Sequence, residues 1–232
     1  MPNAPLKPLQ VGLLGIGTVG LGTWTVLRRN AGEIARRAGR PIRVTWIAER
    51  DLDRARKLTD GAGGVRLTAD AAEVLSHPAI DIVIELIGGL EPARTFILEA
   101  IAHGKHVVTA NKALLARHGN EIFAAAHAQG VMVAFEGAVA GGIPIIKALR
   151  EGLTANRIEW IAGIINGTSN FILSEMRARG APFEAVLREA QARGYAEADP
   201  TADVDPSARH RRNILVLTTS LQRFVHYRTN SA

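Results

Sequence analysis

The sequence has no cysteine among its 232 residues, so disulfide bonds, zinc–cysteine sites and thiol nucleophiles are all excluded. No apolar run approaches the ~20 residues that a membrane-spanning helix needs. The first residues, Met1–Gln10, lack the apolar core of a signal peptide, which makes a cytoplasmic location the expected one. With 47% hydrophobic and 22% charged residues, the composition is that of a globular chain, long enough for one large domain or one domain and part of another.

Acidic residues are missing from one segment, Pro206–Ala232, which we call the tail and which carries five arginines. Without those five, positions 1–205 hold 23 basic and 22 acidic residues, so most of the net charge of +6 belongs to the tail. A nucleic-acid-binding domain usually carries its basic residues as a stripe on its folded body. We therefore expect no nucleic-acid partner and no membrane partner.

Short β-branched runs alternate with longer helical patterns from the first strand to Phe135. Continuous apolar runs of this kind are typical of parallel strands that are buried on both faces. Such alternation predicts an α/β fold, a Rossmann-like doubly wound parallel sheet. The predicted strands are Leu9–Leu14, Ile42–Ala48, Ile82–Leu86, His106–Ala110 and Val131–Phe135, and helical spacing is clearest in Ala93–Ala102 and Asn120–Gln129.

The pattern changes after Phe135. An apolar stretch follows Gly141 and runs to Leu153, and a strand is predicted at Arg157–Ile165. Two helices are predicted at Ser169–Arg179 and Phe183–Arg193, which together indicate an incomplete mixed α/β second domain. The predicted boundaries are 1–137 for the dinucleotide-binding domain, 138–205 for the partial second domain and 206–232 for the divergent basic tail.

A glycine-rich motif, G-x-G-x-x-G, follows the first predicted strand and opens a helical pattern, which is the context that a dinucleotide site requires. Gly15 permits the tight turn, Gly17 lets the backbone approach a diphosphate, and Gly20 lets the helix pack closely on the strand. The alternative is a turn before a helix with no ligand. The predicted cofactor-binding loop consists of Gly15, Ile16, Gly17, Thr18, Val19 and Gly20.

The end of the second predicted strand distinguishes the two nicotinamide cofactors. An acidic residue there binds the ribose 2′-hydroxyl of NAD, whereas an arginine accepts the 2′-phosphate of NADP. Glu49 and Arg50 lie side by side at this point, and Arg54, Arg56 and Lys57 follow. Because Arg50 is backed by further positive charge, we predict NADP, with NAD as the alternative; Arg54 and Arg56 equally suit the solvated face of a helix.

Six motifs now occur in a fixed order along the chain. They are Gly15-Ile-Gly-Thr-Val-Gly20, Glu85-Leu-Ile-Gly-Gly89, Thr109-Ala-Asn-Lys112, Glu136-Gly-Ala-Val-Ala-Gly-Gly-Ile-Pro144, Asn166-Gly-Thr-Ser-Asn170 and Gly194-Tyr-Ala-Glu-Ala-Asp-Pro200. Together they resemble homoserine dehydrogenase over about residues 9–205. The resemblance implies the reversible, NAD(P)-dependent interconversion of L-aspartate 4-semialdehyde and L-homoserine, a step toward threonine, methionine and isoleucine.

Lys112 follows the fourth predicted strand, His106–Ala110, and is thereby placed at the crevice where such sheets bind ligands. The resemblance implies that Lys112 lies beside the nicotinamide and the substrate. A cation there stabilises the negative charge that hydride transfer places on the aldehyde oxygen. The alternative is an exposed lysine at the end of a strand.

The resemblance implies that Glu197 binds the amino group of the substrate and that Gly194 lies beside the cofactor. Tyr195 and Asp203 match further positions on the substrate side. Thr168 opens a predicted helix, and we expect it both to cap that helix and to donate its hydroxyl to the substrate. Without the resemblance, the carboxylates of this segment indicate only a solvated loop.

A monovalent-cation site is also implied by the resemblance. In the family a glutamate and backbone carbonyls hold a sodium ion, and oxygen ligands suit such a hard cation. The alternative is a glycine-rich turn with no ion. The matching positions are Glu136, Val139, Gly141 and Ile143.

The chain departs from the family pattern after Asp205. Pro206 stands where the family has glycine and, counted without gaps, Ala208 replaces an aspartate and Arg212 replaces the lysine credited with proton transfer. Arginine holds its proton up to about pH 12 and is a poor acid at neutral pH. Loss of an acid–base group costs about 10²–10⁴ in rate. We therefore expect impaired activity, and we interpret the tail as truncated or frame-shifted.

Two functions from different classes fit these observations. The leading hypothesis is a homoserine dehydrogenase; the alternative is a non-catalytic dinucleotide-binding fragment that acts only through association with another chain. A different Rossmann oxidoreductase is disfavoured by the motifs at 166–170 and 194–200. The resemblance also implies a homodimer formed through the second domain, although the incomplete second domain argues against one here.

Overall fold

The computed structural model of this chain describes residues 6–59, 63–159, 167–193 and 195–196. The chain divides into two compact units, Met1–Gly152 (unit 1) and Leu153–Ala232 (unit 2). The boundary that the sequence predicts, between residues 137 and 138, falls inside unit 1.

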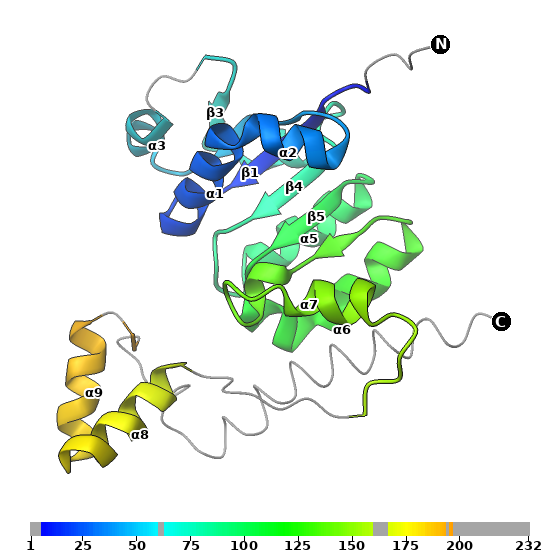
Figure 1. Cartoon of the computed structure of the whole chain (residues 1–232). Coiled ribbons are helices and arrows are strands. Elements are labelled where there is room, and N and C mark those ends of the chain that lie inside the picture. Colours follow the sequence, from blue (N-terminus) through cyan, green and yellow to red (C-terminus); the bar gives the residue numbers. More distant parts are fainter. Residues whose placement is uncertain (1–5, 60–62, 160–166, 194, 197–232) are drawn as a thin grey trace. The chain divides into compact units, whose positions relative to one another are not determined.

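Unit 1 is built on a six-stranded sheet in the order β3-β2-β1-β4-β5-β6, and every neighbouring pair is parallel (Figure 1). This is the strand order of a doubly wound, Rossmann-like fold, and the predicted fold class is confirmed. The strands are β1 (Leu9–Leu14), β2 (Ile42–Ala48), β3 (Arg66–Thr68), β4 (Ile82–Glu85), β5 (His106–Thr109) and β6 (Val133–Ala134).

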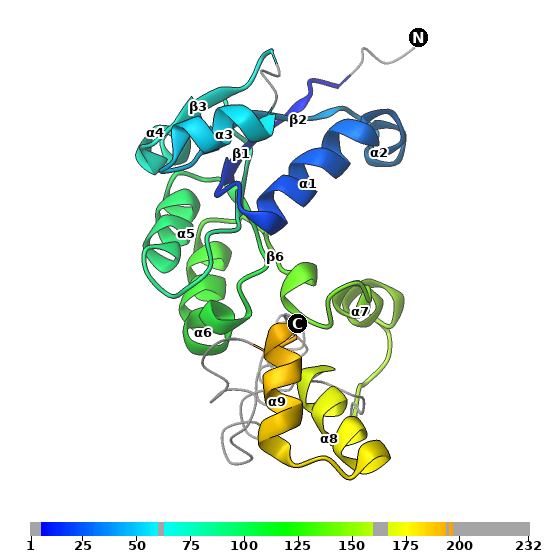
Figure 2. The same cartoon turned by 90° about the vertical axis from the view of Figure 1, so that its left-hand side faces the viewer.

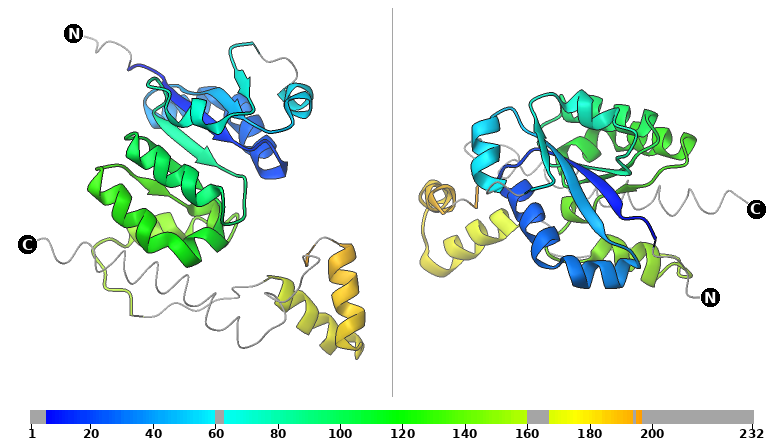
Figure 3. Two further views of the ribbon diagram at one scale, coloured as in Figure 1. Left: turned by 180° about the vertical axis from the view of Figure 1, so that it is seen from behind. Right: turned by 90° about the horizontal axis from the view of Figure 1, so that it is seen from above.

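Helices cover both faces of this sheet. Figure 2 shows α1 and α2 on one side of the strands and α5 and α6 on the other, and the view from above in Figure 3 shows the same layers by colour. The helical elements of unit 1 are α1 (Thr18–Arg29), α2 (Ala31–Ala38), α3 (Leu52–Thr59), α4 (Ala71–Leu75), α5 (Ala93–Ala102), α6 (Lys112–Ala128), the short 3-10 helix η1 (Glu136–Ala138), α7 (Ile145–Lys147) and the π-helical turn η2 (Ala148–Gly152).

The two layers explain why the strands are apolar at successive positions. Leu13 is buried in a cluster with Trp24 of α1, whereas the next residue, Leu14, is buried in a cluster with Ile97 of α5 and Leu114 of α6. Successive side chains of a strand point to opposite faces, so a sheet covered on both sides needs apolar residues at every position. The same rule places one core on each face of the sheet.

Most predicted elements of unit 1 are present, with shifted ends. β1, β2 and α5 match their predicted bounds, β4 and β5 end one residue earlier, and β6 is shorter than Val131–Phe135. The predicted helix Asn120–Gln129 is only the second half of α6, which begins at Lys112. Gly119, the residue before the predicted helix, is buried within α6, where the side chain of Phe123 lies close to it.

Unit 2 contains two described helices, α8 (Gly167–Arg179) and α9 (Phe183–Ala192), within a residue or two of their predicted bounds. They pack through a small core of Ile172, Val186, Ala190 and Ala196. The strand predicted at Arg157–Ile165 is not seen in its described part, residues 157–159, and the rest of it lies outside the described residues. Across the part of the chain that the structure describes, no helix is long and apolar enough to span a bilayer.

Candidate functional site

Five strands of unit 1 end on one line across the sheet, beginning with β3, whose last residue, Thr68, is paired with Ala48. In the parallel register, Leu14 is paired with Ala48 on one side and with Glu85 on the other, and Glu85 is paired with Thr109. The segments that follow these strands therefore leave the sheet at the same edge. The chain runs from β1 to β2 on one side and later returns to β4 on the other, so β1 and β4 flank the topological switch point where such sheets bind ligands.

The loop between β1 and α1 is shaped by two glycines that no other residue can replace without strain. Gly15 has φ +88°, and a Cβ built there lies 3.1 Å from the carbonyl oxygen of Leu86. A Cβ at Gly20 lies 2.2 Å from the carbonyl oxygen of Gly15, closer than any real contact. The first glycine thus makes the turn and the third brings α1 against the turn, as the sequence predicts.

Gly17 differs from its two partners, because a Cβ built on it meets no atom within 4 Å. It is the N-cap residue of α1, with φ −66° and ψ −161°, and α1 has no acidic residue in its first turn but two arginines in its last. The first amides of a helix lack partners within the helix and attract anions. Open space beside Gly17 and the amides of Thr18 and Val19 fit the diphosphate of a dinucleotide.

Glu49 and Arg50, directly after β2, have different roles in the structure. The Glu49 carboxylate accepts a hydrogen bond from the Ile16 amide at 3.0 Å, so it holds the glycine loop. Arg50 is exposed. A pocket of about 440 Å³ lies beside the same loop, where Gly17 and Thr18 contribute one wall and Arg54 of α3 another. The pocket therefore brings the positive charge of Arg54 next to the N-terminus of α1.

The ends of β4 and β5 carry a buried polar network that sequence reasoning missed. Glu85 has no exposed surface, and Thr109 and Asn111 are also buried. Asn111 caps α6 by accepting the Leu114 amide at 3.1 Å, and Lys112 is the exposed first residue of that helix. The available signal was a single acidic residue at the end of an otherwise apolar strand, Ile82–Glu85.

The predicted cation-site residues lie together in unit 1, in the segment that follows β6. Glu136 begins η1, and its carboxylate oxygens accept the amides of Ile146 and Lys147, both at 2.9 Å. The Ile143 carbonyl accepts the Ile145 amide at 2.8 Å. Val139 is buried, and Gly141 and Ile143 are exposed. Within the described ranges, no group of three or more His, Asp or Glu side chains is placed to hold a metal ion.

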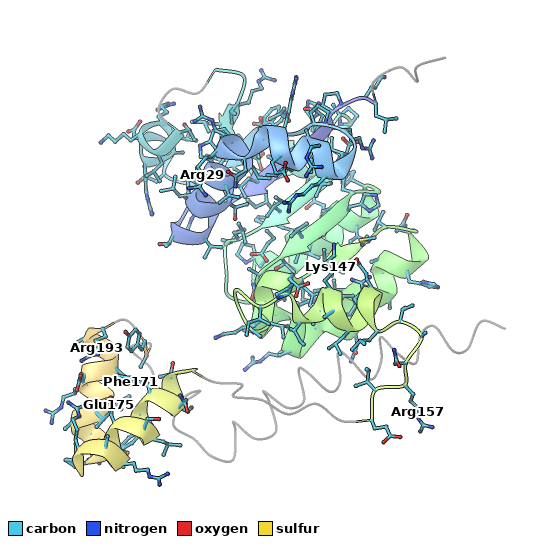
Figure 4. The ribbon with its side chains drawn as sticks, in the orientation of Figure 1. Arg29, Lys147, Arg157, Phe171, Glu175 and Arg193 are labelled. Carbon is cyan, nitrogen blue, oxygen red and sulfur yellow. The ribbon has the colours of Figure 1, made fainter. Side chains whose placement is uncertain are left out.

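Two of the predicted substrate-side residues, Thr168 and Tyr195, lie in the described part of unit 2. The Thr168 hydroxyl donates to the Tyr195 carbonyl, which ties the start of α8 to the segment after α9. Because α8 begins at Gly167, Thr168 lies inside the helix rather than at its cap. The Tyr195 ring packs edge-on against the ring of Phe171 in α8, with 5.2 Å between the ring centroids. The Arg193 guanidinium also lies over the Phe171 ring (Figure 4). Gly194, Glu197 and Asp203 lie outside the described residues.

Comparison with known proteins agrees with this geometry. A family model for the NAD binding domain of homoserine dehydrogenase matches residues 15–136, and a model for homoserine dehydrogenase matches residues 144–229. The second match includes most of the tail. The chain is 62% identical to the homoserine dehydrogenase of Pseudomonas aeruginosa over 211 residues, which are 90% of this chain and 48% of that protein. It therefore spans about half the length of the curated relatives it matches.

Solved structures give the same assignment. The fold matches a homoserine dehydrogenase from Thiobacillus denitrificans with a TM-score of 0.83 and 67% identity, over 92% of this chain and 48% of that one. It also matches a hyperthermophilic archaeal homoserine dehydrogenase in complex with NADPH, with a TM-score of 0.72 and 26% identity over 90% of this chain and 69% of that one. With both family models matched in chain order and the dinucleotide-binding fold in place, this chain belongs to the homoserine dehydrogenase family.

Proposed function

We propose that unit 1 binds NADP(H) and that the chain takes part in the interconversion of L-aspartate 4-semialdehyde and L-homoserine. The observation that carries this proposal is the glycine loop at the switch point, where Gly15 and Gly20 are fixed by close contacts and Gly17 faces open space. The archaeal relative described above holds NADPH. The residues assigned to the diphosphate are Gly15, Ile16, Gly17, Thr18, Val19 and Gly20.

NADP is the cofactor that the charges favour. Glu49 is engaged by the Ile16 amide, so its carboxylate is directed at the loop. Arg50 is exposed at the end of β2, and Arg54 lines the neighbouring pocket. A guanidinium binds a phosphate through charge-assisted hydrogen bonds that are about twice as strong as neutral ones. We therefore assign the 2′-phosphate to Arg50.

Lys112 is assigned to the reacting end of the cofactor. When bound, the dinucleotide supplies or accepts the hydride. Lys112 starts α6 at the carboxyl edge of the sheet, and its exposed ammonium is available to a carbonyl oxygen that gains negative charge. This role needs only a fixed cation within hydrogen-bond reach of that oxygen.

Substrate recognition is assigned to unit 2. The family resemblance implies that Glu197 binds the amino group of the substrate, that Asp203 has a second role on the substrate side and that Gly194 lies beside the cofactor. The hydrogen bond from Thr168 to the Tyr195 carbonyl supports this assignment, because it holds the two described motifs of the unit at one place. This reaction lies in the biosynthesis of threonine, methionine and isoleucine, which we place in the cytoplasm.

We infer that proton transfer is impaired in this chain. Counted without gaps, Ala208 and Arg212 stand where the family resemblance expects an aspartate and a lysine, and both fall within residues 144–229, which the family model matches. Arginine keeps its positive charge and still supports an oxyanion, but it does not release a proton near neutral pH. A rate about 10²–10⁴ below that of an intact site is expected.

Sodium is proposed as a second ligand, at Glu136, Val139, Gly141 and Ile143. Two observations bear on its fit: the four residues occupy one short segment, and each carboxylate oxygen of Glu136 accepts one amide and so keeps a lone pair for a cation. Thermal unfolding in sodium chloride against choline chloride tests it. A higher midpoint in sodium that is lost in Glu136→Gln, and retained in Glu73→Gln at an exposed position of α4, supports the site; equal midpoints in both salts rule it out.

One experiment separates binding from turnover. Titration of the chain with NADPH, followed by nucleotide fluorescence, tests unit 1, and NADPH oxidation in the presence of aspartate semialdehyde tests the reaction. Saturable binding with slow turnover is the expected result. Binding without turnover, even on Arg212→Lys with Ala208→Asp, favours the non-catalytic alternative. No binding of either nicotinamide cofactor would reject the proposed function.

A further inference from the structure

Glu85 is a fully buried carboxylate that neither the glycine loop nor the assigned catalytic residues explain. It is the last residue of β4 and has no exposed surface. One of its oxygens, Oε1, accepts the amides of Ile87 at 2.8 Å and Gly88 at 3.1 Å, and the other, Oε2, accepts the Thr109 hydroxyl at 2.6 Å. A carboxylate in an apolar core is costly unless such bonds satisfy it, so its presence calls for a role that an apolar residue does not fill.

The network continues from Thr109 to the start of α6. The Thr109 hydroxyl oxygen accepts the Asn111 amide at 3.0 Å, and the Asn111 side chain donates to the Gly89 carbonyl at 2.6 Å. The same side chain accepts the Leu114 amide and thereby caps α6. Two segments that leave the sheet at its carboxyl edge, residues 86–89 and residues 110–114, are thus held together by one chain of hydrogen bonds that begins at Glu85.

Residues 86–89 also contact the glycine loop. The Leu86 amide donates to the Leu14 carbonyl at 2.9 Å, and backbone atoms of Leu86 and Ile87 lie 3.1–3.4 Å from the place that a Cβ on Gly15 would occupy. Gly88 and Gly89 have φ of +79° and +72°, in the left-handed region that favours glycine. The hydrogen bonds that the Ile87 and Gly88 amides donate to Glu85 help to fix this loop conformation. A shift of residues 86–89 therefore displaces both the glycine loop and the start of α6.

We propose that Glu85 is a positioning residue for the nicotinamide half of the cofactor. In a doubly wound sheet each half binds one mononucleotide, so β1 to β3 take the adenosine half and β4 to β6 the other. Glu85 is too buried to touch a ligand; it acts through residues 86–89 and through Asn111, which places Lys112. This inference rests on the proposed function, because it presupposes that unit 1 binds the dinucleotide.

Two substitutions break the network with little change of shape. Thr109→Val removes the hydroxyl, which leaves a Glu85 oxygen and the Asn111 amide without partners. Glu85→Gln turns the acceptor that faces Thr109 into a donor. Thr109→Ser keeps the hydroxyl and is the conservative rescue. The matched control is Glu73→Gln, the same change at an exposed position in the first turn of α4.

The test compares two ligands on the whole 232-residue chain by titration calorimetry: NADPH, and adenosine 2′,5′-bisphosphate, which carries only the adenosine half. We expect Thr109→Val and Glu85→Gln to weaken NADPH binding about tenfold or more, as loss of a hydrogen bond to a charged group does, while the bisphosphate affinity changes less than about twofold. Thr109→Ser and Glu73→Gln should keep both affinities.

The outcomes separate this inference from the proposed function. If the unmodified chain binds no NADPH, the proposed function fails and Glu85 has no cofactor to position. If the unmodified chain binds NADPH and both variants bind it equally well, only the Glu85 inference is overturned. Equal weakening of both ligands also overturns it, because general loosening of the fold does not discriminate between the two halves. Should Glu85→Gln fail to fold in thermal unfolding, the Thr109 pair decides alone.

Discussion

Gly17 offers the sharpest test of the cofactor loop, because replacing it affects the ligand and not the fold. In Gly17→Ala the new methyl group has no atom within 4 Å, and the backbone conformation, φ −66° and ψ −161°, is extended and open to alanine. Replacing glycine where the conformation is compatible stabilises a protein by about 0.4–1 kcal/mol through the unfolded chain. The variant should therefore unfold at or slightly above the temperature of the unmodified chain.

Its affinity for NADPH should nevertheless fall. The methyl group fills the space through which a diphosphate approaches the backbone of the loop. A hydrogen bond to a charged group contributes about 1.5–3 kcal/mol, so losing one such bond to the diphosphate corresponds to roughly a 10- to 100-fold weaker complex. Fluorescence titration with NADPH measures this change, and differential scanning calorimetry on the same sample measures stability.

Two comparison variants make the result interpretable. Gly20→Ala places a methyl group 2.2 Å from the Gly15 carbonyl oxygen, so it should lose both affinity and about 1–3 kcal/mol of stability. Gly32→Ala, on exposed α2 with no atom near its new methyl group, should gain roughly 0.5–1 kcal/mol and bind NADPH unchanged. The reasoning is refuted if Gly17→Ala binds NADPH as tightly as Gly32→Ala does.

Three further outcomes are expected. Arg50→Ala should lose roughly tenfold in affinity for NADPH and little for NADH, measured by paired titrations; equal losses contradict the 2′-phosphate assignment. Leu114→Ala, at a fully buried position of α6, should cost about 2–5 kcal/mol in urea unfolding, and a loss below about 1 kcal/mol contradicts the described core. Arg94 of α5 donates to Glu121 of α6 and thereby lowers the pKa of Glu121 below its ordinary value of 4.5. This contact stabilises the fold above pH 4.5 and is lost as pH falls through the lowered pKa, so Arg94→Met should show a shallower acid decline of the melting temperature than the unmodified chain; parallel declines contradict it.

The strands of unit 1 could be predicted because burial on both faces leaves a local signature. β1 and β2 match their predicted bounds residue for residue. α2 left a weaker signal: its apolar residues Ala31, Ile34, Ala35 and Ala38 have helical spacing, but only Ile34 is large and none of the helix's residues is buried. β3 has three residues and begins with the exposed Arg66, so it is recognisable only through its pairing with Trp46 and its neighbours in β2.

The glycine loop could be predicted for a related reason. Gly20 is required by its contact with the Gly15 carbonyl oxygen, five residues away, and the spacing of the motif encodes this contact. Glu85 is different, because its partner Thr109 lies 24 residues away and the two meet only through the parallel register of β4 and β5. Glu49 shows the same limit: its place after β2 suits a ribose ligand, whereas its hydrogen bond to the Ile16 amide, 33 residues away, depends on the pairing of β1 and β2.

The diphosphate and proton-transfer assignments are made to different units: the glycine loop belongs to unit 1 and Arg212 to unit 2, although Lys112, assigned to the reacting end of the cofactor, also belongs to unit 1. Every described contact that shapes the glycine loop, the β4 network and Lys112 is made within residues 6–152. The substrate-side assignments at Thr168, Tyr195 and Glu197 all belong to unit 2. Damage to proton transfer at Arg212 should consequently lower turnover and leave the affinity for NADPH unchanged. A chain in which Arg212→Lys alters NADPH affinity as strongly as it alters rate would contradict this division.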